Sequence, residues 1–101
     1  MLRHIVIWTL PTDKSTEENQ RNAMRIKSGL EGLALVAPGI HSIKVNISPL
    51  PLSTCNAHIV MDSLFEDESA FHAYLSHPEH VAFKSFIQDS TEKRLCMDYL
   101  E

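Results

Sequence analysis

The chain has 101 residues, of which 44% are hydrophobic and 22% are charged, an ordinary balance for one soluble globular domain. The net charge is −4, and the nine lysines and arginines form no dense run, which argues against a nucleic-acid partner or an anionic membrane surface. No apolar run approaches the roughly 18–20 residues of a membrane-spanning helix, and the N-terminus lacks a signal-peptide cleavage site. We therefore expect a single domain over residues 1–101, located in the cytoplasm.

Hydrophobic periodicity and helix caps predict alternating strands and helices. β-Branched and aromatic residues are concentrated in 2–10, as in a strand. Ser15 followed by Glu18 forms a capping box before a helical apolar stripe that ends at Pro38-Gly39. The acidic run at 66–68 suits a helix N-terminus. The expected order is a strand at 2–10, a helix from 15 to 37, strands at 40–47 and 56–65, a helix broken at His77-Pro78, and a strand at 93–100.

This βαββαβ order predicts an α+β fold of the ferredoxin-like type, with a four-stranded antiparallel sheet and a split second helix. The helical segments suffice to cover one face of the sheet. An uncovered second face would expose a larger apolar patch than soluble monomers tolerate. We therefore predict a homodimer in which two sheets pair face to face into a dimeric α/β barrel.

Successive side chains of a strand point to opposite faces, so the strands divide into two sets. The purely apolar set is assigned to the partner and comprises Ile5, Ile7, Ile59, Met61, Phe65, Leu95, Met97 and Tyr99. The mixed set is placed beneath the helices and comprises His4, Val6, Trp8, His58, Val60, Asp62, Arg94, Cys96 and Asp98. Alternatively, the polar residues of the mixed set line the interior of the dimer or lie at the sheet ends in solvent.

The segment from Tyr74 to His80 reads Tyr-Leu-Ser-His-Pro-Glu-His and places a phenol and two imidazoles across a proline break. These groups can move protons near neutral pH. Enolisation requires a base and a donor to the developing oxyanion. We predict His80 as the base, because the positive end of a helix opening at Pro78 disfavours imidazolium. Tyr74 would donate to the carbonyl oxygen.

Residues of the first and last strands complete the predicted site. His4 would be a second donor or proton shuttle, and Asp98 would orient it, since these strands are antiparallel neighbours. His58 is expected near His4, at the start of a parallel neighbour of the first strand. The predicted substrate-binding residues are His58, Val6, Trp8, Val60 and Phe83.

Each of these residues also has a purely structural interpretation. Tyr74 can be a core aromatic, His77 can contact the last carbonyls of a helix, and His80 can donate to a backbone carbonyl. Trp8 can be packing, and Asp62 and Arg94 can neutralise each other across its row.

No metal or cofactor is predicted. His77 and His80 lack the i, i+4 spacing of a zinc-binding helix, and the proline turns the two imidazoles apart. The two cysteines have no CxxC spacing. Cys55 lies in a polar loop signal and Cys96 in a strand pattern, so both are predicted to be ordinary reduced thiols.

Several segments together resemble the stress-responsive dimeric A/B-barrel (Dabb) family. They are Arg3-His4-Ile5-Val6, Pro38-Gly39-Ile40, Phe65-Glu66-Asp67-Glu68-Ser69-Ala70, Tyr74 with His77-Pro78-Glu79-His80, and Met97-Asp98-Tyr99. The resemblance spans nearly the whole chain and implies a ferredoxin-like protomer that pairs into a shared barrel. Most family members have no assigned activity.

One branch of this family, the olivetolic acid cyclase type, closes a linear polyketide by aldol chemistry without a cofactor. Its active-site pattern is similar to His4, His58, Tyr74, His80 and Asp98 of this chain. The chain departs from that branch in three places. Asp62 and Arg94 stand where the cyclase pocket is aliphatic, and Leu30 stands where a tyrosine is expected. These differences argue against a long alkyl-chain polyketide as substrate.

Three functions are compatible with the sequence. The first is a cofactor-independent enzyme that acts on a small carbonyl compound or phenol by cyclisation, isomerisation or oxygenation. The second is a non-catalytic small-molecule binder or stress-associated dimer. The third is a scaffold whose interior is filled by side chains, with Trp8 occupying much of the space. The geometry around His80, Tyr74 and His4 distinguishes them.

Overall fold

The computed structural model describes residues 1–54 and 56–101 and confirms the α+β fold. Cys55, predicted to lie in a loop, falls outside the described residues. The elements are β1 (Leu2–Trp8), α1 (Thr16–Gly32), a 3₁₀ turn (Leu33–Leu35), β2 (Ile40–Asn46), β3 (Ile59–Phe65), α2 (Glu68–Ser76), α3 (Pro78–Ser90) and β4 (Arg94–Leu100).

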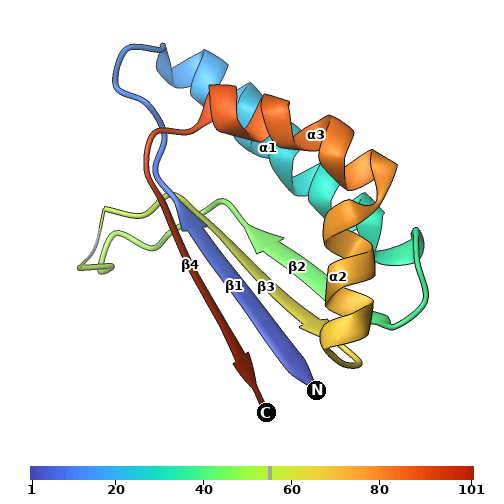
Figure 1. Cartoon of the computed structure of the whole chain (residues 1–101). Coiled ribbons are helices and arrows are strands. Elements are labelled where there is room, and N and C mark those ends of the chain that lie inside the picture. Colours follow the sequence, from blue (N-terminus) through green and yellow to red (C-terminus); the bar gives the residue numbers. More distant parts are fainter. Residues whose placement is uncertain (55) are drawn as a thin grey trace.

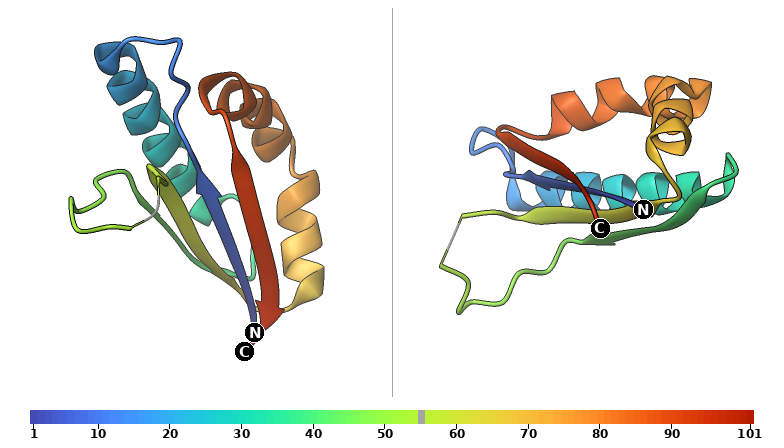
Figure 2. Two further views of the ribbon diagram at one scale, coloured as in Figure 1. Left: turned by 90° about the vertical axis from the view of Figure 1, so that its left-hand side faces the viewer. Right: turned by 60° about the horizontal axis from the view of Figure 1, so that its bottom comes forward.

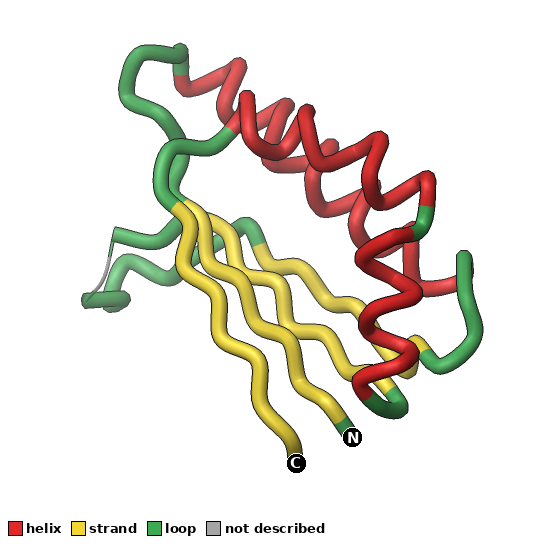
Figure 3. Tube along the Cα trace, in the orientation of Figure 1, coloured by secondary structure: helices red, strands yellow, loops and turns green. Residues whose placement is uncertain are grey.

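Two layers form the molecule. The four strands make one antiparallel sheet in the order β2-β3-β1-β4, and the helices form a layer over one of its faces (Figure 1, Figure 3). The other face carries no helix (Figure 2, right). None of the described helices has the length and apolar character needed to cross a membrane.

The helix boundaries follow from local hydrogen bonds that the sequence encodes. The Ser15 hydroxyl accepts from the Glu18 amide at 3.1 Å, and the Asp67 carboxylate accepts from the Ala70 amide at 2.8 Å. Both side chains satisfy amides that a helix leaves unpaired in its first turn. Pro78 opens α3, as predicted. The α1 helix ends at Gly32 rather than at residue 37, because two late glycines weaken it and the chain tightens into a 3₁₀ turn.

Alternation in β1 confirms its predicted faces, since Leu2, His4, Val6 and Trp8 are buried beneath the helices. Pairing places β4 residues opposite them, so the even-numbered residues Arg94, Cys96 and Asp98 share this helix-covered face. Ile5 and Ile7 therefore lie on the uncovered face with Leu95, Met97 and Tyr99, as predicted.

The predicted faces of β3 are wrong. His4 pairs with Ser63 and Val6 with Met61, which puts the odd-numbered residues of β3 beneath the helices. Ile59, Met61 and Phe65 therefore belong to the core and not to the partner surface, whereas Val60 and Asp62 lie on the uncovered face. The error arose because the apolar run 59–61 has no alternation to show which side is buried.

His58 lies far from His4, contrary to the prediction. The prediction assumed parallel pairing, but β3 runs antiparallel to β1, so its start lies at the Trp8 end. The His58 amide donates to the Trp8 carbonyl at 3.0 Å, and its Nδ1 accepts from the Leu10 amide at 3.0 Å. His58 is an exposed loop residue that fastens the two strand ends together.

The suggested pairing of Asp62 with Arg94 is also wrong, because the two residues lie on opposite faces of the sheet. Asp62 instead accepts from Arg3 Nη1 at 2.9 Å, and Arg3 Nε donates to Glu101 at 2.6 Å. Arg94 makes no ion pair with any residue in the described part of the chain.

Replacing Gly39 by alanine should lower the free energy of unfolding by about 2 kcal/mol, as measured by urea denaturation. Gly39 has a φ of +85°, and an added Cβ would lie 2.6 Å from the Cβ of Ala70 on α2. Gly32→Ala is the matched control, because its Cβ would meet nothing within 4 Å and should stabilise by about 0.5 kcal/mol. Equal effects of the two substitutions would contradict the strained turn.

Candidate functional site

A pocket of about 230 Å³ lies between the helix-covered face of the sheet and α3. This volume lies below the usual range for drug-sized ligands and suits a small molecule. Its lining residues are His4, Val6, Trp8, Leu30, Met61, Tyr74, Leu75, His80, Lys84, Ile87, Gln88, Thr91, Glu92 and Arg94. Aliphatic and aromatic side chains make the walls, and a few ionisable groups interrupt them.

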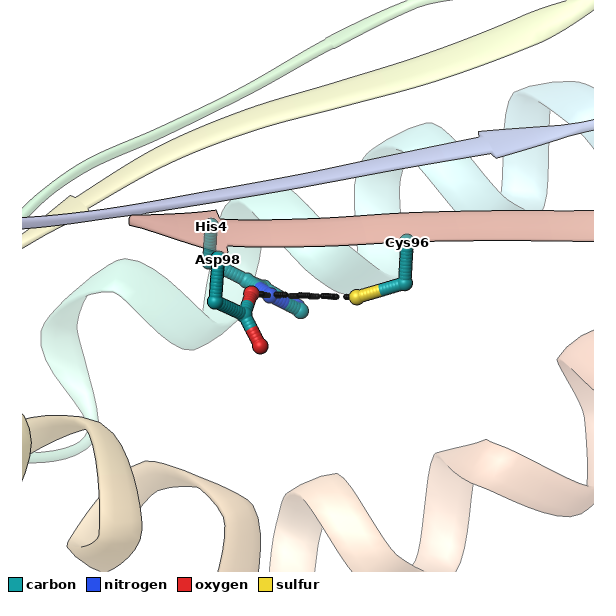
Figure 4. Close-up of side chains that lie close together, drawn as sticks. All are labelled: His4, Cys96 and Asp98. Atoms are coloured by element: carbon teal, nitrogen blue, oxygen red, sulfur yellow. Dashed lines mark hydrogen bonds and ion pairs between the residues drawn. The ribbon is translucent and has the colours of Figure 1, made fainter.

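His4 reaches the pocket from the central strand β1, with only 5% of its side chain exposed. Its Nδ1 bonds to the Asp98 carboxylate, which lies directly opposite on β4 (Figure 4). The contact occupies Nδ1 and leaves Nε2 as the ring nitrogen available to a ligand. Phe71 packs against the imidazole with ring centroids 4.7 Å apart and further restricts its orientation. The predicted contact between Asp98 and His4 is thus present.

Tyr74 and His80 meet across the break between α2 and α3. Their ring centroids are 4.5 Å apart, because Pro78 starts a new helix whose first turn folds back over the end of α2. His77 caps both helices: its amide donates to the Tyr74 carbonyl at 3.2 Å, and its Nδ1 accepts from the Glu79 amide at 3.1 Å. The proline break therefore brings a phenol and an imidazole together.

The Tyr74 hydroxyl is buried and has no hydrogen-bond partner among the described residues. Burial raises the pKa of Tyr74 to about 12, because the phenolate would lose its hydration. At neutral pH the group is therefore a protonated donor. An unpartnered buried hydroxyl is costly, and a ligand oxygen would satisfy it.

His80 is held in the tautomer that a general base requires. Its Nδ1 lies 3.1 Å from the Leu75 carbonyl oxygen, which can only accept, so Nδ1 carries the proton and Nε2 keeps a lone pair. Burial lowers the pKa of His80, and electrostatic repulsion from Lys84, His4 and Arg94 lowers it further against the opposing effect of that hydrogen bond. The neutral imidazole is thus favoured near pH 7. The purely structural interpretation of His80, that it donates to a backbone carbonyl, is therefore compatible with a role as base, because the donation uses Nδ1 and leaves Nε2 free.

Among the described residues, one group of side chains could approach a metal ion. The ligand atoms of His4, Cys96 and Asp98 lie within 4.8 Å of one another, and Cys96 Sγ is 3.7 Å from both partners (Figure 4). A cysteine binds a metal ion as the thiolate, so Cys96 would have to lose its proton. Burial and the neighbouring Asp98 carboxylate raise the pKa of the Cys96 thiol. The arrangement fits a carboxylate that orients a histidine better than it fits a metal centre.

The structure gathers His4, Tyr74, His80, Val6 and Trp8 around one pocket, as predicted. Trp8 lines the pocket without filling it. Three predicted substrate-binding residues lie elsewhere: His58 in an exposed loop, Val60 on the uncovered face, and Phe83 against Gly29 of α1. A single stripe of α3 faces the pocket, and Phe83 lies outside that stripe.

Sequence reasoning missed the pocket residues that follow His80 along α3. Lys84 and Gln88 occur four and eight residues later, which is the spacing of one helix face. Once His80 was placed in the pocket, this periodicity was sufficient to identify them. Glu92 and Thr91 come from the turn into β4 and had no comparable signal.

Comparison with protein families finds a match over residues 2–101 to the stress responsive A/B barrel domain (Dabb). A dimeric protein of unknown function with a ferredoxin-like fold from Bacteroides fragilis is 29% identical, with a TM-score of 0.88 over 99% of this chain and 95% of that one. A Dabb family protein from Mesorhizobium loti is 27% identical, with a TM-score of 0.75 and coverages of 99% and 95%.

A hydroxynitrile lyase from Passiflora edulis shares the fold with a TM-score of 0.78, at 17% identity and coverages of 99% and 92%. At that identity the likeness extends to the fold alone. The comparison with curated proteins finds no match.

Replacing Tyr74 by phenylalanine should raise the free energy of unfolding by up to about 1 kcal/mol, because it deletes a buried hydroxyl that has no protein partner. Urea denaturation at pH 7 measures the change. Tyr99→Phe is the control, since Tyr99 lies on the uncovered face and should change stability by less than about 0.5 kcal/mol. A clear loss of stability in Tyr74→Phe would reveal a partner for the hydroxyl.

Proposed function

The chain belongs to the family of stress responsive A/B barrel domains, and we propose that this member binds a small carbonyl compound in the pocket beneath α3 and removes a proton from it. The observation that carries the proposal is the convergence of three complementary groups on one pocket. They are the neutral imidazole of His80, the protonated phenol of Tyr74, and the imidazole of His4 backed by Asp98.

In the proposed reaction, His80 Nε2 takes the proton from the carbon next to the carbonyl group. The C–H electron pair becomes the C=C bond of an enolate, and the negative charge develops on oxygen. Tyr74 donates to that oxygen, which supplies the missing partner of its hydroxyl. His4 is the second donor, and the Asp98 carboxylate stabilises positive charge on its ring. This chemistry uses only groups of the chain itself.

Proton abstraction is the first step shared by isomerisation, aldol cyclisation and oxygenation of an activated carbon. Return of the proton to a different carbon isomerises the substrate, and attack of the enolate on a second carbonyl of the same molecule closes a ring. Oxygenation needs dioxygen as a co-substrate. Our proposal is limited to this shared proton abstraction. The apolar pocket walls, which include Val6, Leu30 and Ile87, favour the enolate because they keep water away from it.

We also propose that two copies pair through the uncovered face. Leu95 is 73% and Met97 65% exposed there, beside Ile5, Ile7 and Tyr99. Val60 joins this surface in place of Ile59 and Met61. Solved relatives are described as dimeric, and burial of such side chains provides about 1.5–3 kcal/mol each before the costs of association.

The protein should catalyse deuterium incorporation next to the carbonyl group of small ketones, measured by proton NMR in heavy water. His80→Gln should reduce the rate at least about 100-fold, and Tyr74→Phe about tenfold or more. His72→Gln is the matched control, because His72 is an exposed residue of α2 outside the pocket. A rate equal to that of buffer for every ketone tested would leave a binding protein without catalysis.

Because burial lowers the pKa of His80 from the ordinary 6.5, the exchange rate should stay constant as the pH falls through 6.5 and drop only below it. The full pH profile of exchange, from acid to neutral, is the measurement. If the exchange rate falls to half its maximum at or above pH 6.5, another group is the base.

Met97→Asp should convert the dimer to a monomer in sedimentation experiments, because it buries a carboxylate in the apolar interface. Leu100→Asp is the matched control. Leu100 is 68% exposed on the same strand but points to the helix-covered side. Dissociation by both variants, or by neither, would place the interface elsewhere.

A further inference from the structure

Two cations at the mouth of the pocket have no carboxylate partner among the described residues. Lys84 projects from α3 and Arg94 from the start of β4, and both line the pocket that holds His80. Neither makes an ion pair with a residue of the described chain, whereas Arg3 and Lys27 are both paired. Two unpaired cations from separate elements thus share one opening.

The ionisable groups of the pocket are arranged by depth. His4 and Tyr74 are 4% and 1% exposed and form its base, whereas Lys84 and Arg94 are exposed and form its rim. The pairing of Trp8 with Arg94 puts the guanidinium on the helix-covered face, above the same stretch of sheet. His80 lies between the two levels, close enough for both cations to act on its imidazole.

No carboxylate of the described residues forms an ion pair with either of the two cations. Asp98 is engaged by His4, and Asp62 is bound to Arg3 on the opposite face of the sheet. Glu92 is the remaining carboxylate on the pocket and makes no ion pair within the described residues. Among the side chains that line the pocket, two cations therefore face one carboxylate, and Asp98, bonded to His4, is not among them.

We propose that the substrate is a small keto acid, whose carboxylate binds Arg94 and Lys84 at the rim while its carbonyl oxygen reaches Tyr74 at the base. This inference rests on the proposed function and adds the chemical class of the substrate. Arginine and lysine are the residues that recognise carboxylates, arginine through paired donors. An anchor at the rim would also orient the acidic C–H toward His80.

Calorimetric titration of the full chain with matched ligands tests this proposal. The ligands are 4-oxopentanoate and 3-benzoylpropanoate, each compared with its methyl ester at pH 7. The acids should bind about tenfold or more tightly than the esters, and raised salt should reduce the difference. Amide NMR shifts on adding each acid should concentrate at the pocket residues of α3 and β4.

Arg94→Gln should weaken binding of the acids about fivefold or more and leave the esters unchanged. Arg94→Lys should retain only part of the affinity, because it keeps the charge but loses the paired donors. Glu92→Gln should strengthen binding of the acids. Lys93→Gln is the matched control, since it removes the same charge one residue away and does not line the pocket. All of these residues are exposed, so the variants should fold normally.

Equal affinity for acids and esters, no binding of either, or an acid preference unaffected by Arg94→Gln would overturn the proposal. Deuterium exchange separates this result from failure of the proposed function. If exchange is equally fast in acids and esters, the proposed proton abstraction is supported and the proposed carboxylate site is refuted. If acids bind preferentially but no ketone exchanges deuterium, the carboxylate site is supported and the proposed catalysis is refuted.

Discussion

The register of the central strand β1 against its two neighbours is the constraint from which the site follows. Pairing with β4 sets Asp98 opposite His4 and Arg94 opposite Trp8, and pairing with β3 sets Met61 opposite Val6. A shift by one residue would turn every one of these side chains to the other face. Because the helices cover one face alone, that shift would replace the pocket by the apolar surface assigned to the partner.

A second requirement is the interruption of the helical layer at Pro78. A continuous helix would place Tyr74 and His80 six positions apart on different sides of its axis. The break lets the second helix turn back, and the two rings come into contact. His77 lowers the free-energy cost of the break, since its amide and its imidazole form hydrogen bonds with backbone groups of both helices. The residue that separates the two candidate catalytic groups therefore also stabilises their arrangement.

Features encoded within a few residues could be predicted from the sequence. The cap at Ser15, the acidic helix start at 66–68 and the start of α3 at Pro78 depend on neighbouring atoms only. The pairing of His4 with Asp98 also followed, because strand order and alternation define it. The faces of β3 did not follow, since an apolar run of successive residues fits either side. Burial of β3 depends on hydrogen bonds to β1, a strand about fifty to sixty residues earlier in the sequence.

As one of the two edge strands, β4 is bonded along one side only within the described chain. Edge strands of this kind can detach locally at a lower free energy than the whole domain needs to unfold. Such a departure would carry away Asp98, which orients His4, together with Arg94 at the rim. The contact that orients His4 and the positive charge of Arg94 at the pocket rim would then be lost together, while the core around Phe65 and Ile26 stayed intact. The proposed activity would accordingly depend on the fraying of a single strand.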